Sequence, residues 1–510
     1  MRRIALLVAT FGLLVSTSAR ADKPNAIVAP ALSSLEVEQH LLAKALQHVK
    51  DEDEKGAHDV LEAVVAAPAF SQLSDELRHW AFYLLGLTAQ DLGDHKAGLA
   101  YARKAAAMKE ATGADWKLLL NAANAQQDAA NEADALITIA QRWPTTLDQY
   151  RDRYYVNLCV RLKSKDPTRR AAFLNALADA NWSPTDRFEH GSLIWLWLTE
   201  ARLKADDIPG AKAAAEKITS DNDVLMMQSD KLFDPVTTAD PERFRPTEVA
   251  NRRLTDLRNA AAAAPDRIEG PFQIAVQLMT LERNEEALGL MDQTLRIASP
   301  TDGSKTPYTD VDDFLIWVMD TRSRLLKRLG RYDEAVAQEK KVSQYAEDGG
   351  LNISQLLNLG DLLVKVGRPR EAFDLLQDAD ARNMSAYGRM VLMYVRGCAA
   401  EQLHETGETR KALDYLRSHS ADNVGALSDA LACIGDEEGM AKVLVRELND
   451  PDQRDSVLMA FQDFDQAAGV TQQEQLWKQR FQAAAGRAEV QAAVQSVGHI
   501  HKYAMNAPLN

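Results

Sequence analysis

The chain has 510 residues, a formal net charge of −15 at pH 7 and only 6% aromatic residues. This excess of acidic groups disfavours nucleic acids and anionic lipids as partners, because both bind through cationic surfaces. The length exceeds what one hydrophobic core usually supports, so several domains or a one-dimensional stack of repeats is expected. Alternating Val-, Ile- and Thr-rich runs are nearly absent, so the composition favours helices over sheets.

The N-terminus predicts export. Residues 1–21, MRRIALLVATFGLLVSTSARA, contain two leading arginines, an apolar run and the Ala-x-Ala pattern that signal peptidase cleaves. The apolar run is shorter than the roughly 20 residues that span a bilayer, which favours a cleaved signal peptide over a retained membrane anchor. We therefore expect a mature protein that starts near Asp22, is not inserted in a membrane and resides in a bacterial periplasm.

Helical hairpins are expected after an N-terminal leader and first helices at 22–74. In WAFYLLGLTAQDLGDHKAGLAYARKA (80–105), apolar and small residues recur at spacings of three and four, which is typical of one buried helix face. Weaker copies follow, so N-terminal repeats are predicted over 75–219. The periodicity breaks at 220–249, where prolines and aspartates accumulate. We expect an irregular connecting segment there, which is either a spacer or a functional loop.

The clearest hairpin is LNLGDLLVKVGRPREAFDLLQDA, residues 357–379. Its first half has an apolar stripe that includes Leu359 and Leu363. Gly367 can adopt the left-handed conformation that ends a helix. Pro369 suits the first turn of the next helix, where its missing N–H has no intrahelical partner. Two short amphipathic helices joined by a turn are therefore predicted.

Leu356, Leu359, Gly360 and Leu363, followed by Ala372 and Leu376, resemble the tetratricopeptide (TPR) pattern W-x2-L-G-x2-Y…A-x3-F, with Leu at the aromatic positions. Related units are found at 325–342, with Ala335 at the position of Ala372, and at 398–416, with Ala412 at that position. The resemblance implies an all-α fold, a right-handed α-solenoid of stacked helical hairpins with no sizeable sheet. C-terminal repeats would span 250–450, and a helical cap at 451–510 would cover the last one. A non-repeating all-α domain is the alternative.

In the TPR family the first helix of each hairpin lines a concave groove that binds extended peptides or helices of other proteins. The resemblance implies that the groove positions in three successive units are Trp317, Asp320, Arg324, Lys327, Arg328, Asp361, Lys365, Tyr394, Glu401 and His404. The basic members are able to hold a carboxylate or an acidic peptide through charge-assisted hydrogen bonds. The alternative is that they are ordinary solubilising charges.

The sequence contains no recognisable catalytic, metal-binding or cofactor-binding motif. We therefore predict no catalytic residue, no metal ligand and no cofactor. His499 and His501 are either exposed side chains or two ligands that lack a third. Cys398 and Cys433 lie about one repeat apart, so they either meet on adjacent helices or are small buried apolar residues. Cys159 leaves the cysteine number odd.

These patterns predict a non-enzymatic periplasmic scaffold or adaptor, which binds a protein or peptide partner during cell-envelope assembly or export. The alternative is a peptidoglycan-active enzyme with a helical superhelix, similar to the lytic transglycosylases. The catalytic domain and Glu-Ser motif of that family are not recognisable in this sequence.

Overall fold

The computed structural model describes residues 34–185, 188, 191–299, 305–347, 350–379 and 384–507. The predicted signal peptide, residues 1–21, lies outside this range. The chain divides into two compact units, residues 1–194 (unit 1) and 195–510 (unit 2), and the division falls within α10 (Ser192–Lys204). Among the described residues, no helix combines the length and the hydropathy that a bilayer crossing requires.

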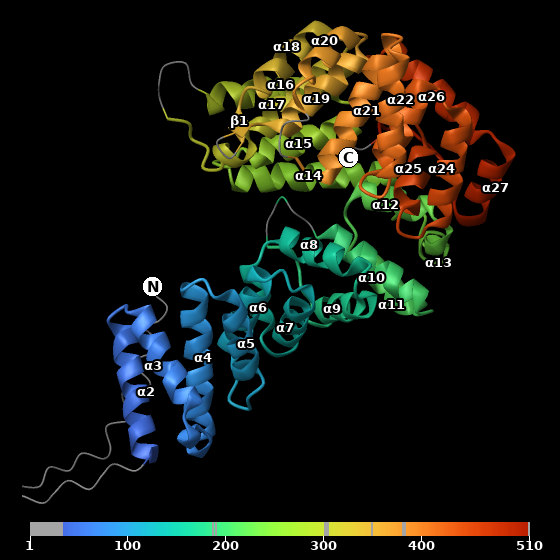
Figure 1. The fold of residues 1–510 in the computed structure, drawn as a ribbon. Coiled ribbons are helices and arrows are strands. Elements are labelled where there is room, and N and C mark those ends of the chain that lie inside the picture. Colours follow the sequence, from blue (N-terminus) through green and yellow to red (C-terminus); the bar gives the residue numbers. More distant parts are fainter. Residues whose placement is uncertain are drawn as a thin grey trace, which may run out of the picture. The chain divides into compact units, whose positions relative to one another are not determined.

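Unit 1 is a stack of helical hairpins (Figure 1). The paired helices are α2 (Ser34–Lys50) with α3 (Glu54–Ala66), α4 (Asp75–Asp91) with α5 (His95–Ala106), α6 (Gly113–Ala125) with α7 (Ala129–Arg142), and α8 (Asp152–Lys163) with α9 (Pro167–Asp179). Short 3-10 turns, η1 (Pro68–Gln72) and η2 (Pro144–Gln149), lie between hairpins. Each of α3 and α5 also packs on the first helix of the next hairpin, so each has a packed helix on two sides.

Unit 2 continues the same design. Its first part contains α11 (Ile208–Ala215), α12 (Asp221–Ser229), η3 (Lys231–Phe233), α13 (Asp234–Thr237), α14 (Pro246–Ala263), α15 (Glu269–Thr280), α16 (Asn284–Ala298), α17 (Val311–Arg328) and α18 (Tyr332–Val342). Its second part contains α19 (Ile353–Lys365), α20 (Pro369–Leu375), α21 (Ala386–Gln402), α22 (Thr406–Ser418), α23 (Val424–Ile434), α24 (Glu437–Asn449), α25 (Arg454–Ala460), α26 (Gln472–Ala485) and α27 (Ala488–Val497). From α14 to α25, each helix packs on the next one along the chain. The predicted all-α solenoid of stacked hairpins is confirmed.

Strands are short among the described residues. β1 (Ala346–Glu347) pairs antiparallel with β2 (Gly350–Leu351), and β3 (Asp463–Phe464) pairs in parallel with β4 (Lys502–Tyr503). The first pair joins α18 to α19. The second pair connects two parts of the C-terminal region that are separated by α26 and α27.

The hairpin turns explain why neighbouring helices pair. The residues with positive φ at these turns are Glu52, Gly93, Gln127, Asp206, Glu282, Gly330, Gly367, His404 and Gly435. Each is followed by the N-cap of the second helix. At eight of these nine turns the N-cap N–H donates a hydrogen bond back to the first helix, as Arg368 N does to Leu363 O at 2.8 Å. The predicted left-handed conformation of Gly367 (φ 76°) and the placement of Pro369 in the first turn of α20 are confirmed.

The segment 220–249 differs from the expectation of irregular structure, because it contains α12, η3, α13 and the start of α14. Its polar residues start helices instead of breaking them. Ser220 caps α12 by accepting a hydrogen bond from Asp223 N at 3.3 Å. Pro235 and Pro246 lie in the first turns of α13 and α14, where proline is favourable. The domain boundaries drawn from the sequence stay predictions.

The C-terminal region returns to the beginning of unit 2. The N–H of His499 donates to Ser229 O at 2.9 Å, at the end of α12. Tyr503 and Met505 are buried in one cluster with Leu225 of α12 and Ala250 of α14. The predicted cap therefore contains more than terminal helices, because its last residues connect the end of the unit to its start.

The two histidines of the H-x-H pair belong to this connection. His499 Nε2 lies 2.9 Å from Asp234 Oδ1, and His501 Nε2 lies 3.2 Å from Gln228 O. Both rings therefore contact the segment around α12 and α13. The described residues contain no group of three or more His, Cys, Asp or Glu side chains placed to hold a metal ion.

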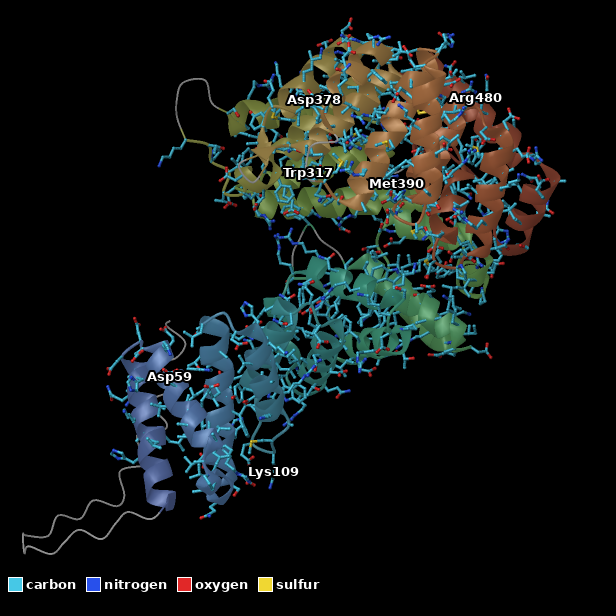
Figure 2. All side chains as sticks on the ribbon, viewed as in Figure 1. Asp59, Lys109, Trp317, Asp378, Met390 and Arg480 are labelled. Atoms are coloured by element: carbon cyan, nitrogen blue, oxygen red, sulfur yellow. A yellow bond between two sulfur atoms is a disulfide. The ribbon has the colours of Figure 1, made fainter. Side chains whose placement is uncertain are left out.

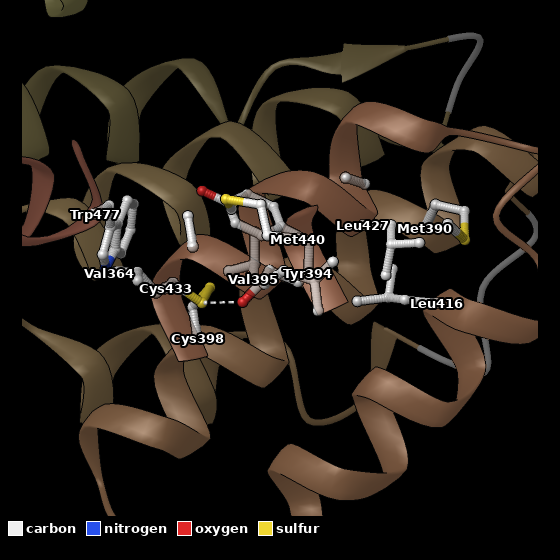
Figure 3. Packing of buried hydrophobic residues seen from close by; sticks show 14 of the residues in the cluster. Val364, Met390, Tyr394, Val395, Cys398, Leu416, Leu427, Cys433, Met440 and Trp477 are labelled. Carbon is white, nitrogen blue, oxygen red and sulfur yellow. Dashed lines mark hydrogen bonds between the residues drawn. A yellow bond between two sulfur atoms is a disulfide. The ribbon is translucent and has the colours of Figure 1, made fainter. Parts of the chain in front are cut away.

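Cys398 of α21 and Cys433 of α23 form a disulfide, with their Cα atoms 5.7 Å apart. The bond joins the first helices of two successive hairpins within a hydrophobic cluster of unit 2, and Figure 3 shows it among these buried side chains. Of the two alternatives left open by the sequence, the structure selects pairing. Cys159 is a buried free cysteine, and burial raises the pKa of its thiol to about 12.

The disulfide predicts a specific thiol count. When the oxidised protein is unfolded without reductant and alkylated, mass spectrometry is expected to find one modified cysteine, Cys159. Reduction is expected to lower the free energy of unfolding of unit 2 by about 2–4 kcal/mol, because the bond closes a long loop in the unfolded chain. The Cys159→Ala variant should show no modified cysteine before reduction. Three modified cysteines in the wild type would contradict the pairing.

Candidate functional site

A polar cavity of about 230 Å³ lies in unit 2, and six of the ten predicted groove residues line it. These six are Asp320, Arg324, Lys327 and Arg328 of α17 and Asp361 and Lys365 of α19. Their spacings of three and four place them on one face of each helix. The register inferred from the hairpin pattern thus brings together side chains from the first helices of two successive hairpins. We call the cavity that they line the polar cavity.

Charged groups in the polar cavity are paired with one another. Arg324 Nε lies 2.8 Å from Asp320 Oδ2. Lys365 Nζ donates to Asp361 Oδ2 at 2.6 Å, and Tyr394 OH of α21 donates to Asp361 Oδ1 at 2.8 Å. Burial alone would lower the pKa of Lys365, but Asp361 raises it above its usual value. Lys365 therefore stays charged. The 32% of its side chain that is exposed to solvent favours the same form.

Helix α26 of the C-terminal region supplies another wall of the polar cavity. Glu474 forms an ion pair with Lys327, and its other oxygen accepts a hydrogen bond from Thr471 N at 2.9 Å. Arg328 Nη1 donates to Met279 O at 2.9 Å, and Gly469 N donates to Arg328 O at 2.7 Å. Burial lowers the pKa of Lys327 and lowers that of Arg328 to about 10. Lys327 and Arg328 thus hold the C-terminal region and α15 against the end of α17.

Glu339 of α18 is the least satisfied group at the polar cavity. It is 2% exposed, and its Oε1 has no hydrogen-bond partner among the described residues. Burial, with repulsion from Asp320, raises the pKa of Glu339 to about 8. Glu339 is therefore mostly neutral at pH 7. The cavity lining contains four basic side chains and the carboxyl groups of Asp320, Glu339, Asp361 and Glu474, and burial raises the pKa of Asp320 as well.

The remaining predicted groove residues lie outside the polar cavity. Trp317 is 49% exposed on α17 and is labelled in Figure 2. Tyr394 is buried and reaches the cavity only through its bond to Asp361. Glu401 is half-buried near the end of α21, away from the cavity lining.

His404 is a turn residue and not a groove residue. Its φ is 59°, and it follows Gly330 and Gly367 at equal intervals of 37 residues. The sequence alignment used Ala412 as the equivalent of Ala372, which shifted the third unit by three residues. The turn positions give the correct register. The interval of 37 residues between Gly330 and Gly367 could have predicted, from the sequence, that the next turn lies at His404.

Sequence reasoning missed Ser323, Glu339, Asn358, Leu362 and Glu474, which also line the polar cavity. Glu339 had a detectable signal, because it lies in the buried stripe of α18 with Ala335, Val336 and Val342. Glu474 forms a capping box with Thr471, but that pattern predicts only where a helix begins. Nothing local indicates that Glu474 reaches Lys327, 147 residues earlier.

Comparisons with known proteins give a structural likeness only. No protein-family model matches the chain, and no curated protein matches it. Solved structures that match include a tetratricopeptide repeat protein from Parabacteroides merdae, with 9% identity over 70% of this chain and 97% of that chain, at a TM-score of 0.26. The complex Cut9–Hcn1 matches at 10% identity over 91% and 96%, with a TM-score of 0.28, and yeast Tom70 at 12% identity over 83% and 99%, with a TM-score of 0.24.

The packing of this chain defines its class. Consecutive hairpins that contact mainly their neighbours form a helical repeat array. Arrays of this class are generally protein–protein interaction scaffolds, because stacking produces extended surfaces that bind other proteins.

Proposed function

We propose that the protein is a non-enzymatic scaffold of the cell envelope, exported to the periplasm, that holds an acidic segment of a protein partner against α17 and α19. The observation that supports this most is the gathering of four basic side chains at one cavity in a chain of net charge −15, beside the buried Glu339, whose carboxyl pKa burial raises to about 8. A volume of about 230 Å³ is below the range of small-molecule pockets, about 300–1000 Å³. It suits one carboxylate side chain of a larger partner.

Trp317 is a second reason to place the partner on α17. It precedes Arg324 by seven residues on α17, which is two helical turns, so both side chains lie on one face of the helix. Its exposure of 49% is unusual for an aromatic side chain of this size. Trp and Arg are the residues most enriched among binding hot spots, so the pair fits a protein interface.

Two observations support export. The N-terminal 21 residues have the pattern of a cleaved signal peptide. The disulfide between Cys398 and Cys433 is the second, since disulfides persist mainly in oxidising compartments such as the periplasm. Assembly or export of envelope components is the role that this location and an acidic scaffold favour.

In-cell crosslinking and recovery of the full-length protein tests the proposal. Trp317→Ala and Arg324→Gln are each expected to reduce recovery of the partner about tenfold or more, because truncated hot spots cost at least about 2 kcal/mol. Lys327 and Arg328 stay unchanged, since they hold the chain's own C-terminal region.

Lys340→Gln is the matched control, because Lys340 pairs with Glu371 at 3.1 Å on the exposed second helices. It should recover the partner as the wild type does. Equal recovery by all three variants would place the partner elsewhere on the array. Recovery of no partner by the wild type would refute the scaffold proposal.

A further inference from the structure

Unit 2 contains a second cavity of about 1260 Å³, which we call the aromatic cavity. It lies between α23, α24, α25 and α26. Trp477, Lys478 and Phe481 contribute to its wall, and these residues follow Glu474 on the same face of α26 at spacings of three, four and seven. The polar cavity and the aromatic cavity therefore lie along one face of the same helix.

One part of the aromatic cavity is apolar. Trp477 and Phe481 of α26 face it together with Phe461, which follows α25. Phe461 and Phe481 pack edge to face, with ring centroids 5.5 Å apart. Met440 and Leu444 of α24 extend this surface. The wall is thus suited to aliphatic or aromatic groups of a ligand.

The other part of the aromatic cavity is strongly acidic. Its ionisable residues are the acidic Asp422, Asp429, Glu447, Asp450 and Asp463 and the basic Arg446 and Lys478. Five carboxylates and two cations give this cavity an acidic lining, whereas acidic and basic residues are equal in number at the polar cavity. A positively charged ligand would be attracted to this wall.

Glu447 is a buried carboxylate of this acidic wall with only one of its two oxygens hydrogen-bonded among the described residues. The residue is 3% exposed, and its Oε1 accepts a hydrogen bond from Arg446 Nε at 2.8 Å. Its Oε2 is buried and has no hydrogen-bond partner among the described residues. An unsatisfied buried carboxylate oxygen is unfavourable, and such groups in native proteins call for a partner. A ligand N–H would provide one.

Asp429 of α23 faces the same cavity. Asp429 is exposed at the cavity, and desolvation by the neighbouring helices raises the pKa of its carboxyl group to about 6, while Lys365 acts in the opposite direction. A cation bound beside Asp429 would favour the charged form of this group. Asp429, which is exposed at the cavity, and Glu447, whose Oε2 has no donor among the described residues, are the two carboxylates that we expect to receive a basic group.

We propose that the aromatic cavity binds a basic peptide segment, with a Lys or Arg side chain directed to Glu447 and Asp429 and apolar neighbours against Trp477 and Phe461. A volume above the usual range for small molecules favours a peptide over a metabolite. This site goes beyond the acidic-partner surface, from which it differs in location and charge preference.

Fluorescence anisotropy with the full-length protein tests the site. The probe is a labelled, capped hexapeptide of alternating Leu and Arg, and two comparison peptides carry Gln or Glu in place of Arg. The Arg peptide is expected to bind at least about tenfold more tightly than the Gln peptide. Asp429→Asn and Glu447→Gln are each expected to weaken its binding about tenfold, because each removes one charged acceptor.

Glu438→Gln is the matched control, with the same charge change on the exposed side of α24, where Glu438 pairs with Lys442 at 2.6 Å. It should bind the Arg peptide as the wild type does, which separates the cavity from general attraction to an acidic protein. If Glu447→Gln fails to fold, Asp429→Asn decides. Equal binding of the Arg and Gln peptides, preference for the Glu peptide, no binding, or wild-type affinity of Asp429→Asn would overturn the proposal. The result is independent of the crosslinking test, which uses other residues and needs no synthetic peptide.

Discussion

Replacing Arg161 by alanine is expected to lower the free energy of unfolding of unit 1 by about 3–5 kcal/mol. Glu132 of α7 is fully buried, and its two oxygens accept hydrogen bonds from Arg161 of α8 at 2.7 and 2.6 Å. Tyr154 OH donates a third bond at 2.8 Å. Without the guanidinium, a buried carboxylate would remain with no opposite charge beside it. Breaking one partner of such a pair costs far more than losing a surface ion pair.

Denaturant unfolding of the full-length protein measures this loss, and hydrogen exchange should locate it in α7 and α8. Arg103→Ala is the control, since Arg103 pairs with Asp128 at 3.1 Å with both side chains partly exposed. It should cost less than about 1 kcal/mol. Adding Glu132→Met to Arg161→Ala should recover much of the stability, because the uncompensated charge is removed. Similar losses in Arg161→Ala and Arg103→Ala would contradict the argument.

Replacing Gly469 by alanine is expected to separate the C-terminal region from the end of α17. A Cβ atom at Gly469 would overlap the carbonyl oxygen of Lys327 and would lie 2.5 Å from Gly330 N and 2.7 Å from Arg328 O. These are backbone atoms on a helix end, so they cannot move aside as a flexible side chain can. We expect unit 2 to lose about 1–3 kcal/mol of stability, the usual cost of overpacking. The Lys327–Glu474 ion pair should weaken with it.

Limited proteolysis and hydrogen exchange at residues 465–471 measure the separation. Gly289→Ala is the matched control, because its Cβ would meet nothing within 4 Å on the exposed face of α16. That substitution should stabilise unit 2 by about 0.5–1 kcal/mol, since alanine favours helix. Protection of residues 465–471 at the wild-type level in Gly469→Ala would show that the close approach is unimportant.

The hairpins could be predicted because their signals are local. Gly367 and Pro369 mark a turn through their own conformational preferences, and the apolar stripes around Leu359 and Leu363 recur within one helix. The same local reasoning gave a wrong prediction at 220–249, where prolines are compatible both with a loop and with the start of a helix. Pro235 and Pro246 suggested irregular structure, yet proline in the first helical turn is compatible with a helix.

The candidate sites were predictable only in part. Arg324 and Asp361 came from successive hairpins of regular spacing, so a family pattern placed both at one cavity. His404 failed because a single small residue, Ala412, fixed the register of its unit. The aromatic cavity escaped notice altogether, since Glu447 and Trp477 belong to different hairpins and no repeat relates them.

The sequence by itself determined the all-helical repeat architecture, because spacings of three and four residues and the turn residues between helices act within a few positions. Only the tertiary structure decided which distant side chains meet. It paired Cys398 with Cys433, brought Glu474 to Lys327 and His499 to the end of α12. The physical reason is that such contacts depend on how far the stack curves and where its C-terminal region returns. Both follow from the sum of many packed interfaces, and no local pattern encodes them.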